Sequence, residues 1–146
     1  MAVQRNHRAR RLALQALCSL DVQGRHVLDL VNDFIDDSRE PAPVLTAARA
    51  LLLGTYEQFQ QVDRFLTRHA RHWDLGRLAM VDRNILRLAT FEMLQGKTPF
   101  KVVISEALLL AKEFSTAESP RFVNGVLDAV AREIAKDISP PSADVE

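Results

Sequence analysis

The stretch SPRFVNGVLD near the C-terminus brings together residue types that could bind a nucleic acid. Its opening Ser-Pro pair is typical of a helix start, where free backbone N–H groups and the helix dipole favour a phosphate. Arg121 would add a cation there, Phe122 could stack on a base, and Asn124 could hydrogen-bond one. The alternative is that the Phe122 ring fills the core and the other residues only cap the helix.

A second group of cations lies near the N-terminus, where four arginines occur between residues 5 and 11. On a helix, Arg8, Arg11 and Gln15 share one flank, which would form a basic face. Such a face is often only solvated, but four arginines this close exceed what helix capping needs. Together with Phe122 they favour RNA over DNA, because no helix-turn-helix pattern is present. The group consists of Arg5, Arg8, Arg10 and Arg11.

The charge of the chain is balanced in total but uneven along its length. Lysine and arginine number 19, as do aspartate and glutamate, so the formal net charge is zero. The first 26 residues hold five arginines against one aspartate. The next twenty hold four aspartates and one glutamate against one arginine. This distribution indicates a local anion-binding patch beside an acidic segment.

Signatures of catalysis are missing from the sequence. It contains no glycine-rich phosphate loop, no HExxH and no GxSxG, so we expect no enzymatic activity. His69 and His72 could share a helix face, but no third ligand is near them, and a solvated or packed pair is the favoured interpretation. No metal and no cofactor are expected. The single cysteine, Cys18, excludes an intramolecular disulfide and is assigned to packing or an interface.

Apolar residues recur at three- and four-residue steps throughout, and no segment alternates as a half-buried strand would, which predicts an all-α chain of about seven helices. The segment 78–95 is apolar on nearly every side and is expected to be the central helix. Glu92 lies on its apolar stripe, so its carboxylate needs a partner, for which Arg83 or Arg87 is expected. The predicted helices span residues 4–23, 28–35, 44–56, 59–68, 78–95, 101–114 and 119 onward.

The first helix has apolar residues on two sides. Opposite its main apolar stripe lie Leu14 and Cys18, which need a second covering surface. A later helix of the same chain is the favoured interpretation, and a protein partner is the alternative.

The 146 residues fit one domain, predicted over 1–137, followed by a disordered tail at 138–146 that contains two prolines. The longest apolar run, 107–111, is far shorter than the roughly 20 residues that span a bilayer. We therefore expect a cytoplasmic protein with no membrane contact.

Four segments also resemble the family of the bacterial transcription antitermination factor NusB. They are RNHRARRLALQALCSL, VDRNILRLATFEML, PFKVVISEALLLAKEFS and SPRFVNGVLD. The resemblance covers about residues 5–135 in family order. It implies two packed helical sub-bundles that bind the single-stranded RNA leader element boxA together with a ribosomal small-subunit protein. The pair would join an elongation complex that resists termination during ribosomal RNA synthesis, as an adaptor without a reaction of its own.

The resemblance also assigns residues to these contacts. Its RNA-facing positions fall on Arg5, Arg8, Arg10, Arg11, Gln15, Glu118, Ser119, Arg121, Phe122 and Asn124. Its partner-protein surface includes Cys18 and Asp82, beside which Leu14 is a further candidate. The sequence departs from the family pattern at Cys18, which is commonly aromatic, and at Ser105, where asparagine is usual.

Two alternatives to the free-standing factor remain open. The same helical fold occurs as the N-terminal RNA-binding domain of ribosomal RNA cytosine methyltransferases. A helical protein-interaction module without RNA is the second. In addition, the chain could self-associate as a homodimer through the first helix, which would compete with a partner protein.

Overall fold

The computed structural model describes residues 2–69 and 78–138, and within these two ranges it consists of helices without a strand. The prediction of an all-α chain with about seven helices is confirmed. A short 3-10 helix, η1 (Arg25–Val27), joins the first two α-helices. The α-helices are α1 (Ala2–Gln23), α2 (Leu28–Asp36), α3 (Ala42–Glu57), α4 (Phe59–His69), α5 (Met80–Gln95), α6 (Phe100–Phe114) and α7 (Ser119–Ile138).

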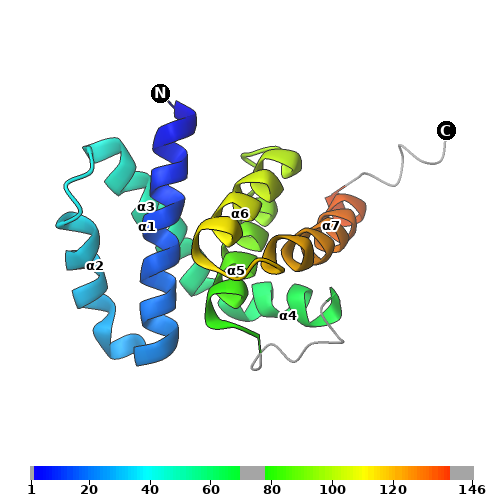
Figure 1. The fold of residues 1–146 in the computed structure, drawn as a ribbon, viewed down its shortest axis with the longest axis horizontal. Coiled ribbons are helices and arrows are strands. Elements are labelled where there is room, and N and C mark those ends of the chain that lie inside the picture. Colours follow the sequence, from blue (N-terminus) through cyan, green and yellow to red (C-terminus); the bar gives the residue numbers. More distant parts are fainter. Residues whose placement is uncertain (1, 70–77, 139–146) are drawn as a thin grey trace.

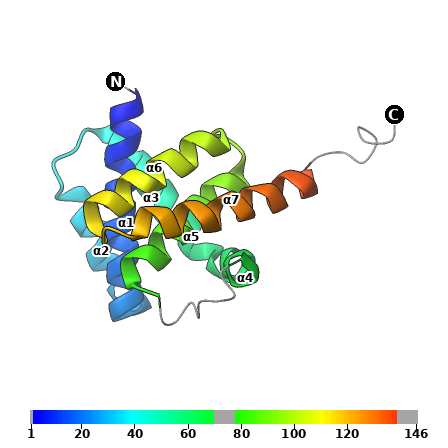
Figure 2. The same ribbon diagram turned by 45° about the vertical axis from the view of Figure 1, so that its right-hand side comes forward.

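The helices form two packed groups, with α1, α2 and α3 in one and α4 to α7 in the other (Figure 1). The central helix α5 joins the groups, because it packs against α1 and α3 as well as against α4, α6 and α7. In the turned view of Figure 2, α6 and α7 lie side by side. This arrangement places the basic end of α1 in the first group and the start of α7 in the second.

The burial of α5 follows from this central position. Its side chains are buried on several sides, as the apolar pattern of residues 78–95 predicts. Gly54 of α3 lies directly against the ring of Phe91 on α5, and a Cβ at Gly54 would stand 2.1 Å from the ring. The close approach of α3 to α5 therefore requires glycine at this position.

Two glycines end helices in the way that the sequence indicates. Gly24 follows α1 with φ of 94°, and Gly96 follows α5 with φ of 73°, conformations that residues with a Cβ rarely adopt. The predicted boundaries of these helices lie within two residues of those observed.

Leu14 is covered by the chain itself. It is 1% exposed and belongs to the core, together with the predicted apolar stripe of α1. The favoured interpretation of its position, burial under other helices, is confirmed, and the assignment of Leu14 to a partner surface is wrong. Cys18, one turn further along, is only partly buried.

Some predictions cannot be placed in this structure. His72 and residues 139–146 of the predicted tail lie outside the described residues. Within the described parts, no helix is both long and apolar enough to cross a membrane.

Candidate nucleic-acid interface

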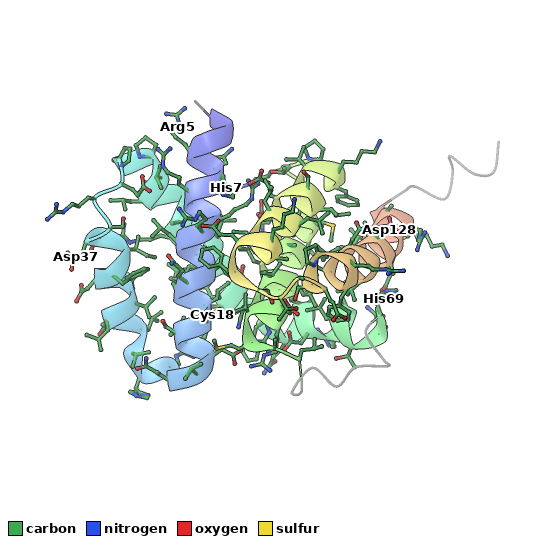
Figure 3. The ribbon with its side chains drawn as sticks, viewed as in Figure 1. Arg5, His7, Cys18, Asp37, His69 and Asp128 are labelled. Carbon is green, nitrogen blue, oxygen red and sulfur yellow. The ribbon has the colours of Figure 1, made fainter. Side chains whose placement is uncertain are left out.

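The outward face of α1 presents a row of polar and basic side chains. Arg5 and Gln15 are exposed, while the Arg8 and Arg11 side chains are 35% and 39% exposed. Figure 3 shows Arg5 near the N-terminal end of α1, directed away from the helix bundle. The flank that the helical spacing of Arg8, Arg11 and Gln15 predicts is thus a surface in the folded chain.

Carboxylates from other helices hold two of these arginines in place. Arg8 Nε donates to Glu40 Oε1 at 2.8 Å, and Arg11 Nη2 lies 2.6 Å from Glu113 Oε2. The Arg11 guanidinium also lies over the Phe114 ring, 5.5 Å from its centroid. Arg11 therefore connects the basic face of α1 to the C-terminal end of α6.

Arg10 points inward and is not part of this face. Its side chain is 7% exposed, and it donates through Nε and Nη2 to the two carboxylate oxygens of Glu92, both at 2.8 Å. Burial lowers the pKa of this guanidinium, but its hydrogen bonds and charge contacts with Glu92 and Glu106 outweigh that effect and leave the pKa raised. The assignment of Arg10 to RNA is wrong, because its guanidinium is committed to a buried ion pair.

The same ion pair corrects the predicted partner of Glu92. Arg83 and Arg87 were expected to pair with it, but Arg83 binds Asp21, and Arg87 binds Asp21 and Asp63. The burial of Arg10, though not its partner, had a signal in the sequence. Arg10 stands three and seven residues before Ala13 and Leu17, so helical spacing places it on the buried stripe of α1.

A third carboxylate extends the cluster to α6 and to the surface. Glu106 accepts hydrogen bonds from Arg10 Nη1 at 3.5 Å and from His7 Nδ1 at 3.0 Å. His7 Nε2 lies 3.9 Å from Glu113, the residue that also holds Arg11. These contacts form a chain of polar and charged groups that runs from the core out to the basic face of α1.

The start of α7 is fixed by a buried carboxylate on α5. Asp82 is 8% exposed and accepts hydrogen bonds from the hydroxyls of Ser115 at 2.7 Å and Ser119 at 2.9 Å. Ser119 is 3% exposed and is the first residue of α7. Because its hydroxyl donates to Asp82 on α5, it serves as a contact between helices and not as the cap of α7. Both side chains are largely buried, and the assignments of Ser119 to RNA and of Asp82 to a partner protein stay predictions. Asp82 also places a negative charge where a phosphate was expected to bind.

A groove of about 680 Å³ opens beside this carboxylate. Its lining includes Glu118, Arg121 and Phe122, along with the buried Asp82 and Ser119. The side chain of Arg121 is exposed, and so is that of Asn124 on the next part of α7. Phe122 is partly buried, packs against the core and also lines the groove.

The two predicted parts of the interface come near one another through α6. Phe114, whose ring Arg11 covers, ends α6, and the segment that follows leads through Ser115 into the groove at the start of α7. Phe114, Glu113 and Glu40 also belong to this surface, although nothing in the local sequence around them indicates it. Only the fold brings them to α1, so no local sequence pattern could have found them.

Cys18 lies in a setting that keeps its thiol protonated. Burial and the nearby charge of Asp21 together raise the pKa of Cys18 to about 11, although the charge of Arg83 opposes the shift. Asp21 is an ion-pair acceptor for Arg83 and Arg87 and also accepts a hydrogen bond from Asn84. A protonated, half-buried thiol fits packing or protein contact better than nucleophilic chemistry.

The histidine predicted to be solvated or packed has a carboxylate partner. His69 Nε2 hydrogen-bonds Glu133 of α7, which also pairs with Arg68. Among the described residues, no group of three His, Cys, Asp or Glu side chains is arranged to hold a metal ion.

Comparisons with known proteins give a consistent result. The NusB family model matches residues 7–132. The transcription antitermination protein NusB of Solibacter usitatus is 46% identical over 142 residues, covering 92% of this chain and 94% of that protein. The structure of T. maritima NusB has a TM-score of 0.80 at 35% identity, covering 88% of this chain and 91% of that chain. A complex of the antitermination factors NusB and NusE with double-stranded RNA contains a chain of the same fold, with a TM-score of 0.79 at 23% identity, covering 91% of this chain and 98% of that one.

Replacement of Arg10 by methionine is expected to lower the free energy of unfolding by about 3–5 kcal/mol, because it leaves the Glu92 carboxylate buried without its partner. Urea denaturation monitored by circular dichroism measures this change. Arg8→Met, which removes a partly exposed ion pair, is the matched control and should cost at most about 1 kcal/mol. The double variant Arg10→Met/Glu92→Met should recover most of the loss. A double variant as unstable as Arg10→Met would contradict the ion-pair explanation.

Alkylation of Cys18 by iodoacetamide is expected to be slow at pH 8, because only the thiolate reacts. A rise in the thiol pKa from 9.0 to about 11 reduces the thiolate fraction by about a hundredfold. Mass spectrometry of the folded protein from pH 7 to 11 should show a rate that still increases above pH 9. The protein unfolded in urea is the control, and its rate should level off at lower pH. Equal pH profiles for the two states would contradict the raised pKa.

Proposed function

The chain belongs to the NusB family, and we propose that it binds boxA-like single-stranded leader RNA together with a ribosomal small-subunit protein. In this role it is a transcription antitermination factor that joins the elongation complex in the cytoplasm. Its curated relatives are named as transcription antitermination proteins, which favours this function over a methyltransferase domain and agrees with the prediction that the chain is not an enzyme.

The observation that carries the RNA contact is the surface formed by α1 and the start of α7. The exposed face of α1 offers Arg5, Arg8 and Arg11, and the contact of Arg11 with Phe114 leads from it to the end of α6. Beyond Phe114, the groove at α7 presents Arg121 and Phe122, and Asn124 is exposed on the next part of the helix. A strand that followed this surface would meet cations first and then an aromatic ring.

The ion pairs on α1 do not prevent such binding. The ion pairs of Arg8 and Arg11 with their carboxylates are partly exposed to solvent. Exposed ion pairs contribute about 0–1 kcal/mol to the stability of the fold. A phosphate can therefore replace Glu40 or Glu113 at small cost. Release of counterions from the RNA then favours the complex at low salt.

The groove at α7 is suited to an unpaired base more than to a phosphate alone. Asp82 already places a carboxylate beneath the start of α7, so the charge on Arg121 is needed to attract the RNA backbone there. The accessible part of the Phe122 ring would stack on a base, and the exposed amide of Asn124 would hydrogen-bond it. Both interactions require bases that are free of a complementary strand.

The contact with the ribosomal protein is proposed at the C-terminal half of α1 and the start of α5. Cys18 is partly exposed there, and the buried side chain of Asp82 would act by holding the neighbouring segment in shape. The solved complex in which NusB, NusE and RNA occur together supports a joint RNA and protein surface in a chain of this fold. A homodimer that used the same part of α1 would compete with this partner.

Titration of fluorescently labelled RNA tests the proposed function directly. A boxA-like single strand should bind more tightly than a scrambled strand of equal length and composition, and the purified ribosomal partner should increase that preference. Fluorescence anisotropy at fixed salt measures both effects. Equal, weak binding of the two strands with and without the partner would exclude the specific function.

Arg8→Ala is expected to reduce the dependence of RNA affinity on salt, because one phosphate contact is lost. The slope of log K against log salt should become smaller by about 0.7, the value for one contact on a single strand. Arg132→Ala is the matched control, since Arg132 is exposed on α7 and pairs only locally with Asp128. An unchanged slope for Arg8→Ala would show that Arg8 does not contact an RNA phosphate.

Phe122→Leu separates stacking from packing, because leucine keeps an apolar side chain against the core but has no aromatic face. Loss of the stacked base should weaken RNA binding by roughly 1–3 kcal/mol. The free energy of unfolding, measured by urea denaturation, should change much less. Unchanged RNA affinity together with reduced stability would assign Phe122 to the core.

A further inference from the structure

A groove between α1 and α2 has no part in the proposed RNA contact apart from Gln15 at its edge. Its volume is about 340 Å³. The α1 side is formed by polar residues that include Ser19 and Gln23, and the opposite side is an apolar wall that includes Leu30 and Phe34. Figure 1 shows α2 on the outer side of α1, away from α5, α6 and α7.

Two residues of the apolar wall are largely exposed. Leu30 and Phe34 stand one turn apart on α2 and are 67% and 44% exposed. Their neighbours Val31 and Ile35 are 5% and 0% exposed and attach α2 to the core. The helix therefore buries one apolar side and leaves a second apolar stripe uncovered in this chain. Aromatic and large aliphatic side chains in such a position commonly anchor a protein partner.

A row of carboxylates borders this stripe. Asp29, Asp33 and Asp37 are exposed and follow one another at four-residue steps, so they lie on one side of the helix next to Leu30. None of the three forms an ion pair with a side chain in the described part of the chain, whereas Asp36 pairs with Arg49. Figure 3 shows Asp37 at the end of α2, pointing away from the protein.

The carboxylates are unfavourably placed for the isolated chain. Like charges four residues apart on a helix repel one another, and this applies to both successive pairs in the row. Asp37 is the C-cap of α2, where the helix dipole disfavours a negative charge. A cationic group at this rim would relieve both effects. The charge pattern thus points to a binding partner that brings positive charge.

We propose that the groove between α1 and α2 binds a basic amphipathic helix of a partner protein. Its apolar residues would pack on Leu30 and Phe34, and its lysines or arginines would lie against Asp29, Asp33 and Asp37. An apolar floor with a charged rim is the arrangement by which grooves take up amphipathic helices. RNA and anionic lipid surfaces are disfavoured here because the rim would repel their phosphates.

This surface adjoins the one proposed for RNA and the ribosomal protein, because Gln15, Ser19 and Gln23 of α1 line the groove, but its apolar wall and its carboxylates belong to α2 and the residue after it. The RNA surface depends on the exposed arginines of α1 and on the start of α7, whereas the groove depends on α2. A basic helix at α2 could therefore bind while RNA is bound, and its binding can be measured without RNA. Failure of one proposal leaves the other open to its own test.

A synthetic peptide provides the probe. We would use a fluorescein-labelled peptide of about 18 residues with leucines at helical spacing and lysines on both flanks, and a second peptide in which glutamates replace the lysines. Fluorescence anisotropy with the full chain should show saturable binding of the basic peptide and none of the acidic one. The affinity should fall as salt increases, because the carboxylates at the rim are exposed.

Two variants and their matched controls locate the binding. Leu30→Ser/Phe34→Ser should weaken the affinity for the basic peptide by at least about tenfold. Its control, Val102→Ser/Leu109→Ser, changes two similarly exposed residues of α6 and should leave the affinity unchanged. Asp29→Asn/Asp33→Asn should weaken binding severalfold and reduce its salt dependence. Glu57→Gln/Asp128→Asn changes the net charge equally on α3 and α7 and should leave binding unchanged. The charge variants carry the test if the serine variant fails to fold.

Several outcomes would overturn the proposal. They are the absence of saturable binding, equal binding of the basic and acidic peptides, and equal loss in the groove variants and their controls. Analytical ultracentrifugation tests whether a second copy occupies the groove. A dimer that Leu30→Ser/Phe34→Ser abolishes would assign the apolar stripe to self-association and would also overturn the proposal.

Discussion

The buried pairing of Arg10 with Glu92 is the interaction on which the arrangement of this molecule most depends. It joins α1 of the first helix group to α5 of the second, and Glu106 brings in α6. A guanidinium this deeply buried is tolerated only while carboxylates surround it, so the three helices must keep their relative positions. The pairing also fixes how α1 is turned about its axis. With Arg10 directed inward, the helical spacing turns Arg8 and Arg11 outward, where RNA can reach them.

The fold could be predicted from sequence much further than the site. Apolar spacing located the helices, and the apolar character of 78–95 identified the central helix, because burial of a helix face leaves a repeated local pattern. The partner of a charged side chain, in contrast, produces no repeated pattern in the local sequence. Arg10 looked like one of four surface arginines, although its spacing from Ala13 and Leu17 already placed it on the buried stripe. Glu92 pairs with Arg10, and not with Arg83 or Arg87. This pairing joins residues that are 82 positions apart, so no local pattern indicates it.

The start of α7 shows the same limit for polar residues. A serine before a proline predicts a helix start, and α7 does begin at Ser119. The hydroxyl, however, binds Asp82 on α5 and is buried. Local propensity thus located the element but not the use of its side chain, because a buried carboxylate offered a stronger partner than the helix's own N–H groups. Arg121 and Asn124 on the same part of α7 remain exposed.

The zero net charge of the chain conceals two surfaces of opposite sign on neighbouring helices. Arg8 of the basic face of α1 pairs with Glu40, which lies in the segment between α2 and α3, close to the end of the acidic rim. The two surfaces present charges of opposite sign, with arginines on α1 and aspartates on α2. Each surface therefore excludes the ligand suited to the other: phosphates are repelled from α2, and cationic side chains from α1. This separation would allow a small adaptor to hold RNA and a basic protein segment together without competition between them.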